Sequence, residues 1–517
     1  MKPQLTHFPT SRRTAYQFPI YRWMGWLAVG GFAIGLTAMF FISGMFGVPA
    51  PLGWATLVIL FSLGALLLDR PKLLLNCMLI YFLMMPRNRL FGILALPLPS
   101  FLDELFFIPF IAVIVMNWIQ RRQVQGGGWF PLIFGLIATL SWFVNGRLSP
   151  FTFVRATLIM LKPFIIWYYC RLTATFESEA PIRRWLWFAF IFAAIQFPYN
   201  CIWQGAPWPK IHADYSGGMF GPGAGGHLIG YLSMYALILM AGWWVGEGHH
   251  SRRRIKGWAL FLLLVISYDL IFMTDTKHAL VIAPFALIPF MYHPRVSMRL
   301  KTILGISGLL FMVTAVFYLW LFMGSLNLRP HLDRMLNSPK GDVMAAVTVD
   351  FKYLVPYPFL GAGPGRFGSS LSVDDATPLA RRYILPIMDE RRRYFMSAGA
   401  TGFRTGGSQL VWPQSDFFTL MGEYGWAGTL VYFSFWGWVV LQLLRKSYQV
   451  SSNTLLFGTQ LALACCLMFL AMIMMFVTPV TMPVLSFTMW AFVGRVWDMK
   501  PTARPEAGAE TLLPEGV

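Results

Sequence analysis

The sequence predicts an all-α, polytopic membrane protein with about 14 (12–14) transmembrane helices and one large polar loop. Three observations lead to this prediction. Of the 517 residues, 57% are hydrophobic and 12% are charged, about half the charged fraction of a typical soluble protein. The mean hydropathy is +0.58. Long apolar runs recur from residue 24 to residue 497, which excludes a soluble domain with a single membrane anchor.

The first half of the chain is a series of apolar runs separated by short basic or Pro-rich turns. After a polar segment at 1–23, the runs predict helices over about 24–45, 54–68, 73–86, 105–119, 129–145, 151–170 and 185–203. The first run is too long for the core of a signal peptide, so we expect an uncleaved helix. A Gly/Pro-rich loop follows at 204–226.

The second half contains the longest polar segment. Helices are expected over about 227–245, 257–273, 279–292 and 302–324, which completes a transmembrane part at 24–324. The polar segment 325–416 follows. Three more helices, at about 417–443, 454–477 and 483–497, form a second transmembrane part at 417–497. The tail at 498–517 is rich in Pro, Ala and Glu and is predicted to be disordered.

The distribution of Lys and Arg predicts the orientation. The net charge is +19, and most basic clusters fall on the side of the membrane that carries both termini. The positive-inside rule assigns that side to the cytoplasm and places 325–416 outside it. The excess charge is therefore explained by retention of loops and contact with anionic lipid. We see no nucleic-acid-binding module in the sequence, so no nucleic-acid partner is expected.

The five cysteines lie in or beside apolar runs and lack the spacing of metal ligands. They are interpreted as small hydrophobic residues, and neither a metal site nor a cofactor is expected.

Two short stretches could contact a ligand. Six glycines between residues 217 and 226 precede His227, at the start of a helix whose free N–H groups could face an anion. A flexible connector would have the same glycine-rich sequence. Lys277 lies in a turn at the outer end of a helix, where it could bind a ligand or extend to the interface.

Helix 151–170 carries two cations on one face. Arg155 and Lys162 are seven residues apart, about 10 Å along the axis. Lys162 lies inside the apolar run, where a cation costs about 2.5–3.5 kcal/mol and needs a partner or a water-filled cavity. Asp269 is a candidate partner. A structural ion pair and a substrate contact both remain open.

The polar segment 325–416 contains one further motif, and a second motif lies at its end. The run 358–367 resembles a phosphate-binding glycine loop only superficially, and a tight turn explains it equally well. It contains Arg366. The segment closes on Gln414, Ser415 and Asp416, and the sequence Glu-Tyr-Gly follows at 423–425. An Asp directly before an apolar helix can also be its N-cap.

Four stretches, 215–227, 276–279, 358–367 and 414–428, resemble in their order the bacterial O-antigen ligase and O-antigen/exopolysaccharide polymerase superfamily. That family has a Gly-rich loop, a Ser-Arg turn and a Pro-Xaa-Xaa-Gly-Xaa-Gly stretch in a large periplasmic loop. A His-Asn pair follows, and Glu-Xaa-Gly-Xaa-Xaa-Gly begins nine residues after the His. The resemblance covers residues 215–430 and implies that 325–416 is the large periplasmic loop.

The resemblance implies a metal-independent glycosyltransferase of the bacterial inner membrane, whose donor glycan is carried on undecaprenyl diphosphate. An acceptor hydroxyl attacks the anomeric carbon, and the lipid diphosphate leaves. Lys277 stands at the position of the family's arginine. The expected substrate-binding residues are Lys277, Arg155, Arg366, His227, His278 and Lys162.

The sequence departs from the family at the expected base, because Gln414 replaces the histidine. A glutamine orients a hydroxyl but takes no proton at physiological pH. Asp416 and Gln414 are the catalytic candidates, His227 or His278 could supply the base instead, and a reaction without a strong base also remains open.

The preferred interpretation is a polymerase that extends a polysaccharide from lipid-linked repeat units. A ligase that joins the glycan to lipid A core is the alternative within the class. A polysaccharide or lipid exporter is the alternative from another class, although exporters usually have internal repeats and functional groups at the bilayer midplane. The expected partners are the undecaprenyl diphosphate-linked oligosaccharide, membrane lipid, and a chain-length regulator or export proteins.

Overall fold

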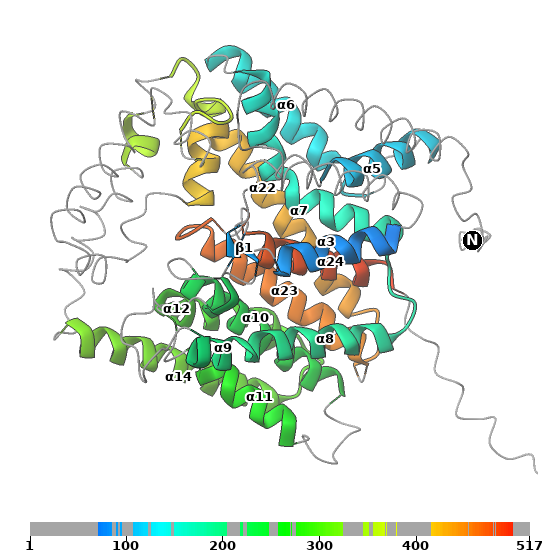
Figure 1. The fold of residues 1–517 in the computed structure, drawn as a ribbon, viewed down its shortest axis with the longest axis vertical. Helices are drawn as coiled ribbons and strands as arrows, with labels where there is room; N and C mark the ends of the chain where they lie inside the picture. Colours follow the sequence, from blue (N-terminus) through cyan, green and yellow to red (C-terminus); the bar gives the residue numbers. More distant parts are fainter. Residues whose placement is uncertain are drawn as a thin grey trace, which may run out of the picture.

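Among the residues that the computed structural model describes, the regular secondary structure is helical apart from one pair of two-residue strands (Figure 1). Those residues are 71–84, 89–90, 94–95, 107–121, 126–145, 149–203, 218–220, 225–247, 257–268, 270, 274, 276–323, 345–350, 355–367, 369, 379, 415–452, 454–478, 480 and 482–499. The strands β1 (Arg89–Leu90) and β2 (Leu94–Ala95) pair antiparallel.

Most of the helices precede the long polar segment. In chain order they are α3 (Pro71–Met84), α5 (Phe107–Arg121), α6 (Trp129–Asn145), α7 (Pro150–Thr173), α8 (Glu179–Ala194), α9 (Gln196–Trp203), the 3-10 turn η3 (Gly218–Phe220), α10 (Gly225–Glu247), α11 (Gly257–Tyr268), α12 (Lys277–Ala286), α13 (Ile288–Tyr292) and α14 (Met298–Met323).

The remaining elements lie in and after that segment. They are η5 (Ala346–Asp350), η6 (Pro358–Leu360), α22 (Asp416–Ser447), α23 (Leu455–Ile473) and α24 (Pro483–Trp497). Every apolar run expected to be helical between residues 73 and 497 overlaps one or two of the observed helices. The expected helices 24–45 and 54–68, the N-terminal segment 1–23, and the tail beyond residue 499 lie outside the described residues.

Two of the expected helices are broken by proline. The run 185–203 divides into α8 and α9 around Ile195, and the run 279–292 divides into α12 and α13 around Leu287. Pro198 and Pro289 follow these breaks. A proline ring clashes with the carbonyl four residues earlier and has no N–H to donate, which ends the preceding helix at that point.

Four helices are long and apolar enough to cross a membrane: Pro150–Thr173, His227–Glu247, Asp416–Ser447 and Leu455–Ile473. Five shorter apolar helices accompany them in the described part of the chain. These lengths and compositions are those of a helical membrane protein.

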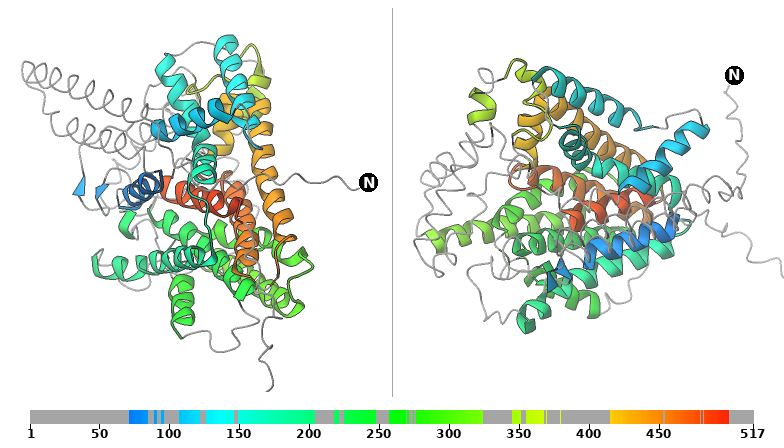
Figure 2. Two further views of the ribbon diagram at one scale, coloured as in Figure 1. Left: turned by 90° about the vertical axis from the view of Figure 1, so that its right-hand side faces the viewer. Right: turned by 45° about the horizontal axis from the view of Figure 1, so that its top comes forward.

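Helix α23 lies inside the bundle and packs against both α10 and α22 (Figure 1). Figure 2 shows α22 and α23 running side by side, with α24 next to them. The contact between α10 and α23 is close because glycines meet there. A Cβ added to Gly242 would lie 2.5 Å from the carbonyl oxygen of Gly458, and one added to Gly246 would lie 2.5 Å from that of Thr454. Small residues of this kind let membrane helices approach closely.

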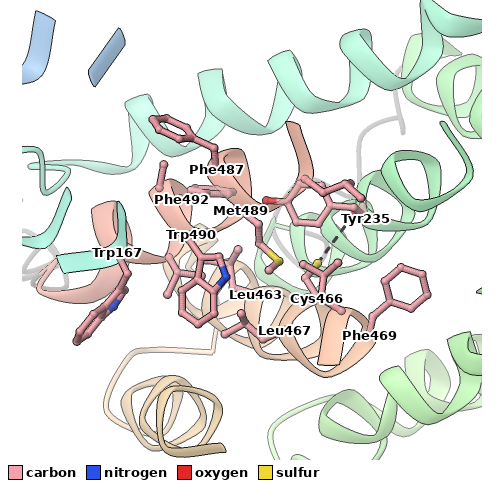
Figure 3. Packing of buried hydrophobic residues seen from close by; sticks show 14 of the residues in the cluster. Trp167, Tyr235, Leu463, Cys466, Leu467, Phe469, Phe487, Met489, Trp490 and Phe492 are labelled. Atoms are coloured by element: carbon pink, nitrogen blue, oxygen red, sulfur yellow. Dashed lines mark hydrogen bonds between the residues drawn. The ribbon is translucent and has the colours of Figure 1, made fainter. Parts of the chain in front are cut away.

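Large side chains fill the space between the helices at the centre of the bundle (Figure 3). Trp490 of α24 packs edge-to-face on Trp436 of α22, with ring centroids 5.0 Å apart. Trp167 of α7 is fully buried, and its backbone would clash with any side chain at Gly494 of α24. The interdigitated core holds α7, α22, α23 and α24 in one arrangement, and this arrangement positions the groups described next.

Candidate functional site

The first two turns of α22 carry two buried carboxylates. Asp416 and Glu423 are each 1% exposed. Seven residues separate them, which is about 10 Å along a helix. Each carboxylate accepts hydrogen bonds from a different segment of the chain, so this helix end joins parts that are far apart in the sequence.

The N-cap of α22 is Ser415. Its hydroxyl accepts a hydrogen bond from the amide of Phe418 at 3.4 Å and donates one to the carbonyl of Met474 at 2.6 Å. Asp416 is the first helical residue, so the interpretation of Asp416 as the N-cap is wrong. The cap passes to the serine because its backbone is extended while that of Asp416 is already helical.

The carboxylate of Asp416 instead binds the turn that joins α23 to α24. Oδ2 accepts a hydrogen bond from the amide of Val480 at 2.6 Å, and the amide of Asp416 donates to the carbonyl of Val477 at 3.0 Å. Oδ1 is buried and has no hydrogen-bond partner among the described residues. A buried carboxylate oxygen without a partner is costly and therefore calls for an explanation.

Lys162 of α7 supplies positive charge near this carboxylate. It is 5% exposed, its charge interacts with that of Asp416, and its ammonium group lies 5.6 Å from the centre of the Phe107 ring. Asp269, the partner expected from the sequence, lies outside the described residues. The charge interaction joins the middle of α7 to the start of α22.

The α23–α24 turn also contacts His278, one of the two candidate histidines. The ring of Phe476 stacks on His278 of α12 with centroids 5.4 Å apart. Nε2 of His278 is 2.5 Å from the hydroxyl of Tyr231 on α10, and its ring is 6.0 Å from that of His227. The ends of α10 and α12 are pressed together, since any side chain at Gly230 would overlap Thr276.

Helix α22 is interrupted just after Glu423. Gly425 has φ +65° and ψ −169°, which only glycine adopts at low cost. The interruption leaves the carbonyls of residues 422 and 423 free for other donors. The amide of Ala362 donates to Gly422 at 2.7 Å, and the amide of Gly363 donates to Glu423 at 3.0 Å.

The carboxylate of Glu423 accepts four further hydrogen bonds from the same stretch. Oε2 accepts from the amide of Gly365 at 2.7 Å. Oε1 accepts from the amides of Phe367 at 3.2 Å and Ser369 at 3.0 Å, and from the Ser369 hydroxyl at 2.6 Å. The glycine-rich loop therefore directs its amides at this carboxylate. Those amides are occupied, so the structure provides no phosphate cradle in the loop.

Arg366 lies between two residues that Glu423 binds. Its guanidinium donates through Nη1 to the carbonyls of Asn145, the last residue of α6, and of Ala362. The side chain of Asn145 in turn binds the amide of Tyr357 at 2.9 Å and the carbonyl of Gly361 at 2.6 Å. Burial lowers the pKa of the Arg366 guanidinium from its ordinary value, although arginine stays protonated in proteins.

The other expected residues are less completely described. Arg155 is half-buried on α7. Lys277 is the first residue of α12, and its side chain lies outside the described part, as does the whole of Gln414. The structure thus brings Asp416 close to Lys162 and to the α23–α24 turn. That turn contacts His278, and His278 in turn lies beside His227. It places Arg366 in the cluster around Glu423.

Sequence reasoning did not identify Glu423, Asn145 or Tyr231 as site residues. Glu423 appeared only as part of a motif, although a lone carboxylate in an apolar helix is a signal of a buried polar contact. Asn145 and Tyr231 had no comparable signal, because polar residues at helix ends and tyrosines in membrane helices are common.

No group of three or more His, Cys, Asp or Glu side chains in the described part of the chain could hold a metal ion. The chain matches no protein-family model, and no curated protein matches it either.

Proposed function

We propose that the protein is a membrane glycosyltransferase that polymerises a polysaccharide from undecaprenyl diphosphate-linked repeat units. The reaction takes place at the periplasmic face of a bacterial inner membrane, in O-antigen or exopolysaccharide biosynthesis. In this proposal the chain has about 14 (12–14) transmembrane helices, both termini are cytoplasmic, and 325–416 is the periplasmic loop. The charge asymmetry of the loops supports that orientation.

One observation carries the proposal. Two of the four stretches that resemble the polymerase superfamily, 358–367 and 414–428, are hydrogen-bonded to each other at the first turns of α22. The turn that follows α23 binds Asp416 and also contacts His278 of a third stretch, whose ring lies 6.0 Å from that of His227 in the fourth. A glycosyl transfer from a lipid diphosphate needs cations for the leaving group and a group that orients or deprotonates the acceptor hydroxyl. The cluster contains side chains of both kinds.

In the proposed reaction, the acceptor oxygen forms a bond to the anomeric carbon of the donor while the bond from that carbon to the diphosphate oxygen breaks. The electron pair leaves with the diphosphate, and Lys277, Arg155 and Arg366 neutralise its charge. Asp416 takes the hydroxyl proton through Oδ1, because Oδ2 is held by the Val480 amide.

His278 is the second candidate for the base. Its Nε2 contacts the Tyr231 hydroxyl at 2.5 Å, a hydrogen bond that orients the ring. His227 lies beside His278. In this proposal His227 and Lys162 contact the sugar or the diphosphate and take no part in the proton transfer.

Reconstitution tests the proposal directly. The purified full-length chain is placed in lipid vesicles with an undecaprenyl diphosphate-linked oligosaccharide, and glycan length and free undecaprenyl diphosphate are measured. Longer glycan with release of the lipid diphosphate is the expected result. Transfer only after lipid A core is added would identify a ligase. Movement of unchanged oligosaccharide across the vesicle membrane would identify an exporter, and absence of all three would refute the proposal.

A further inference from the structure

Glu423 lies in an apolar helix yet receives a complete set of donors from one short segment. Three backbone amides and one hydroxyl, all between residues 365 and 369, point at its two oxygens. A deprotonated carboxylate only accepts hydrogen bonds, and it can accept about four. Of the side chains of similar length, only a carboxylate matches this set, because the amide nitrogen of a glutamine would face the N–H of Gly365.

Both oxygens of Glu423 are engaged by these donors. A general base must present a lone pair to the proton that it takes, and hydrogen bonds to a carboxylate stabilise its charged form. The contacts therefore disfavour Glu423 as the base and favour a role in holding the segment that surrounds it.

That segment contains one of the candidate cations. Gly365 and Phe367, the neighbours of Arg366, both donate to the Glu423 carboxylate, so the backbone at 366 has little freedom. The opposite side of the segment rests on α7, where a Cβ on Gly365 would lie 2.8 Å from the side chain of Thr152. Arg155 is one turn further along α7 on the same face.

We propose that Glu423 is a positioning residue for Arg366. Its carboxylate fixes residues 361–367 and Ser369 between α22 and α7, so that the Arg366 guanidinium stays at the end of α6 and close to the helix that carries Arg155. This assignment rests on the proposed function in one respect, namely that Arg366 neutralises the departing diphosphate. The placement of Arg366 by Glu423 stands independently of that function.

A double-mutant cycle measures the dependence of one residue on the other. Glu423→Gln is expected to lower the rate of polymer formation about 10²-fold, the effect of misplacing a catalytic group by about 1 Å. Arg366→Ala is expected to lower it by about 10²–10³-fold, as for other lost charge-stabilising donors. If Glu423 acts through Arg366, the double variant is no slower than Arg366→Ala alone. Losses that multiply would overturn the proposal.

A milder variant and a matched control accompany the cycle. Ser369→Ala removes the hydroxyl donor and keeps the backbone amides, so it should lower the rate of polymer formation less than Glu423→Gln does. In the Arg366→Ala background it should cause no further loss. Glu247→Gln makes the same chemical change at the other end of the bundle, where the carboxylate binds Arg183 and Trp243. That control is expected to retain wild-type activity.

A second measurement is independent of enzyme activity. The five native cysteines are replaced by alanine, Arg366→Cys is introduced, and its labelling by a maleimide is timed in the purified full-length protein. Adding Glu423→Gln should accelerate labelling severalfold, because the segment is released. Tyr357→Cys, at a residue already 56% exposed, should label at an unchanged rate.

The two readouts separate the possible failures. If the wild-type chain makes no polymer while labelling at 366 accelerates in Glu423→Gln, the proposed function fails and the placement of Arg366 by Glu423 stands. If polymer forms but labelling is unchanged and the activity losses multiply, the function stands and Glu423 is not the positioning residue.

Discussion

Replacing Gly458 by alanine should destabilise the bundle, because the added methyl group has no room. A Cβ at 458 would overlap the carbonyl oxygen of Gly242 and lie 2.7 Å from the amide nitrogen of Gly246. Ordinary van der Waals contact begins at 3.4 Å. All of the nearest atoms belong to the backbone of α10, so a side-chain rotation cannot relieve the overlap. The two helices must separate by about 1 Å in a core packed to crystal density.

The expected cost follows from that separation. Overpacking of this kind costs about 1–3 kcal/mol. Alanine recovers about 0.5–1 kcal/mol through its better helix propensity, so we expect a net loss of about 1 kcal/mol, the middle of a range of about 0–2.5 kcal/mol. Gly437 on α22 is the matched control, because a Cβ there meets nothing within 4 Å. Gly437→Ala should therefore gain about 0.5–1 kcal/mol.

The assay is the thermal midpoint of the monodisperse protein in detergent, followed by size-exclusion chromatography after heating. Gly458→Ala should lower the midpoint and Gly437→Ala should raise it. If Gly458→Ala equals or exceeds the wild type while Gly437→Ala behaves as expected, the close packing of α10 on α23 is wrong.

Three further predictions concern the site and the topology. Asp416→Asn keeps an oxygen for the Val480 amide but cannot take a proton, so chain growth should stop at normal protein abundance; full-length polymer would reduce Asp416 to holding the α23–α24 turn. Lys277→Ala should abolish polymer formation and Lys277→Arg should retain part of it, since charge persists with altered geometry; wild-type chain length from Lys277→Ala would remove Lys277 from the mechanism. Reporter fusions at Lys340 and after Lys500 should report opposite sides of the membrane, and same-side signals would contradict the proposed topology.

The helices could be predicted from the sequence because apolar runs of about 20 residues leave the chain few alternatives in lipid. The boundaries of α6, α10 and α24 agree with the expected ones to within two residues. The breaks before Pro198 and Pro289 were missed, although each proline signals its own break. Charged and His side chains at helix ends are conspicuous in an apolar chain, so the sequence also suggests candidate site residues, and their roles stay predictions.

The connections among those residues could not be predicted. The Glu423 carboxylate binds an amide 58 positions away, and Asn145 binds a carbonyl 216 positions away. Likewise, the sequence did not show that Ser415 caps α22, or that the Asp416 carboxylate binds an amide 64 positions further along the chain. The periodicity of the sequence describes which face of a helix is apolar. These hydrogen bonds depend instead on which helices pack together and on how far each is shifted along its axis relative to its neighbour. By itself, the sequence determined that the chain is a helical membrane protein with polar groups at certain helix ends. Only the packing of α22 against α6, α7 and α23 decided which of those groups meet, because hydrogen bonds form over about 3 Å and helix positions are set by the whole core.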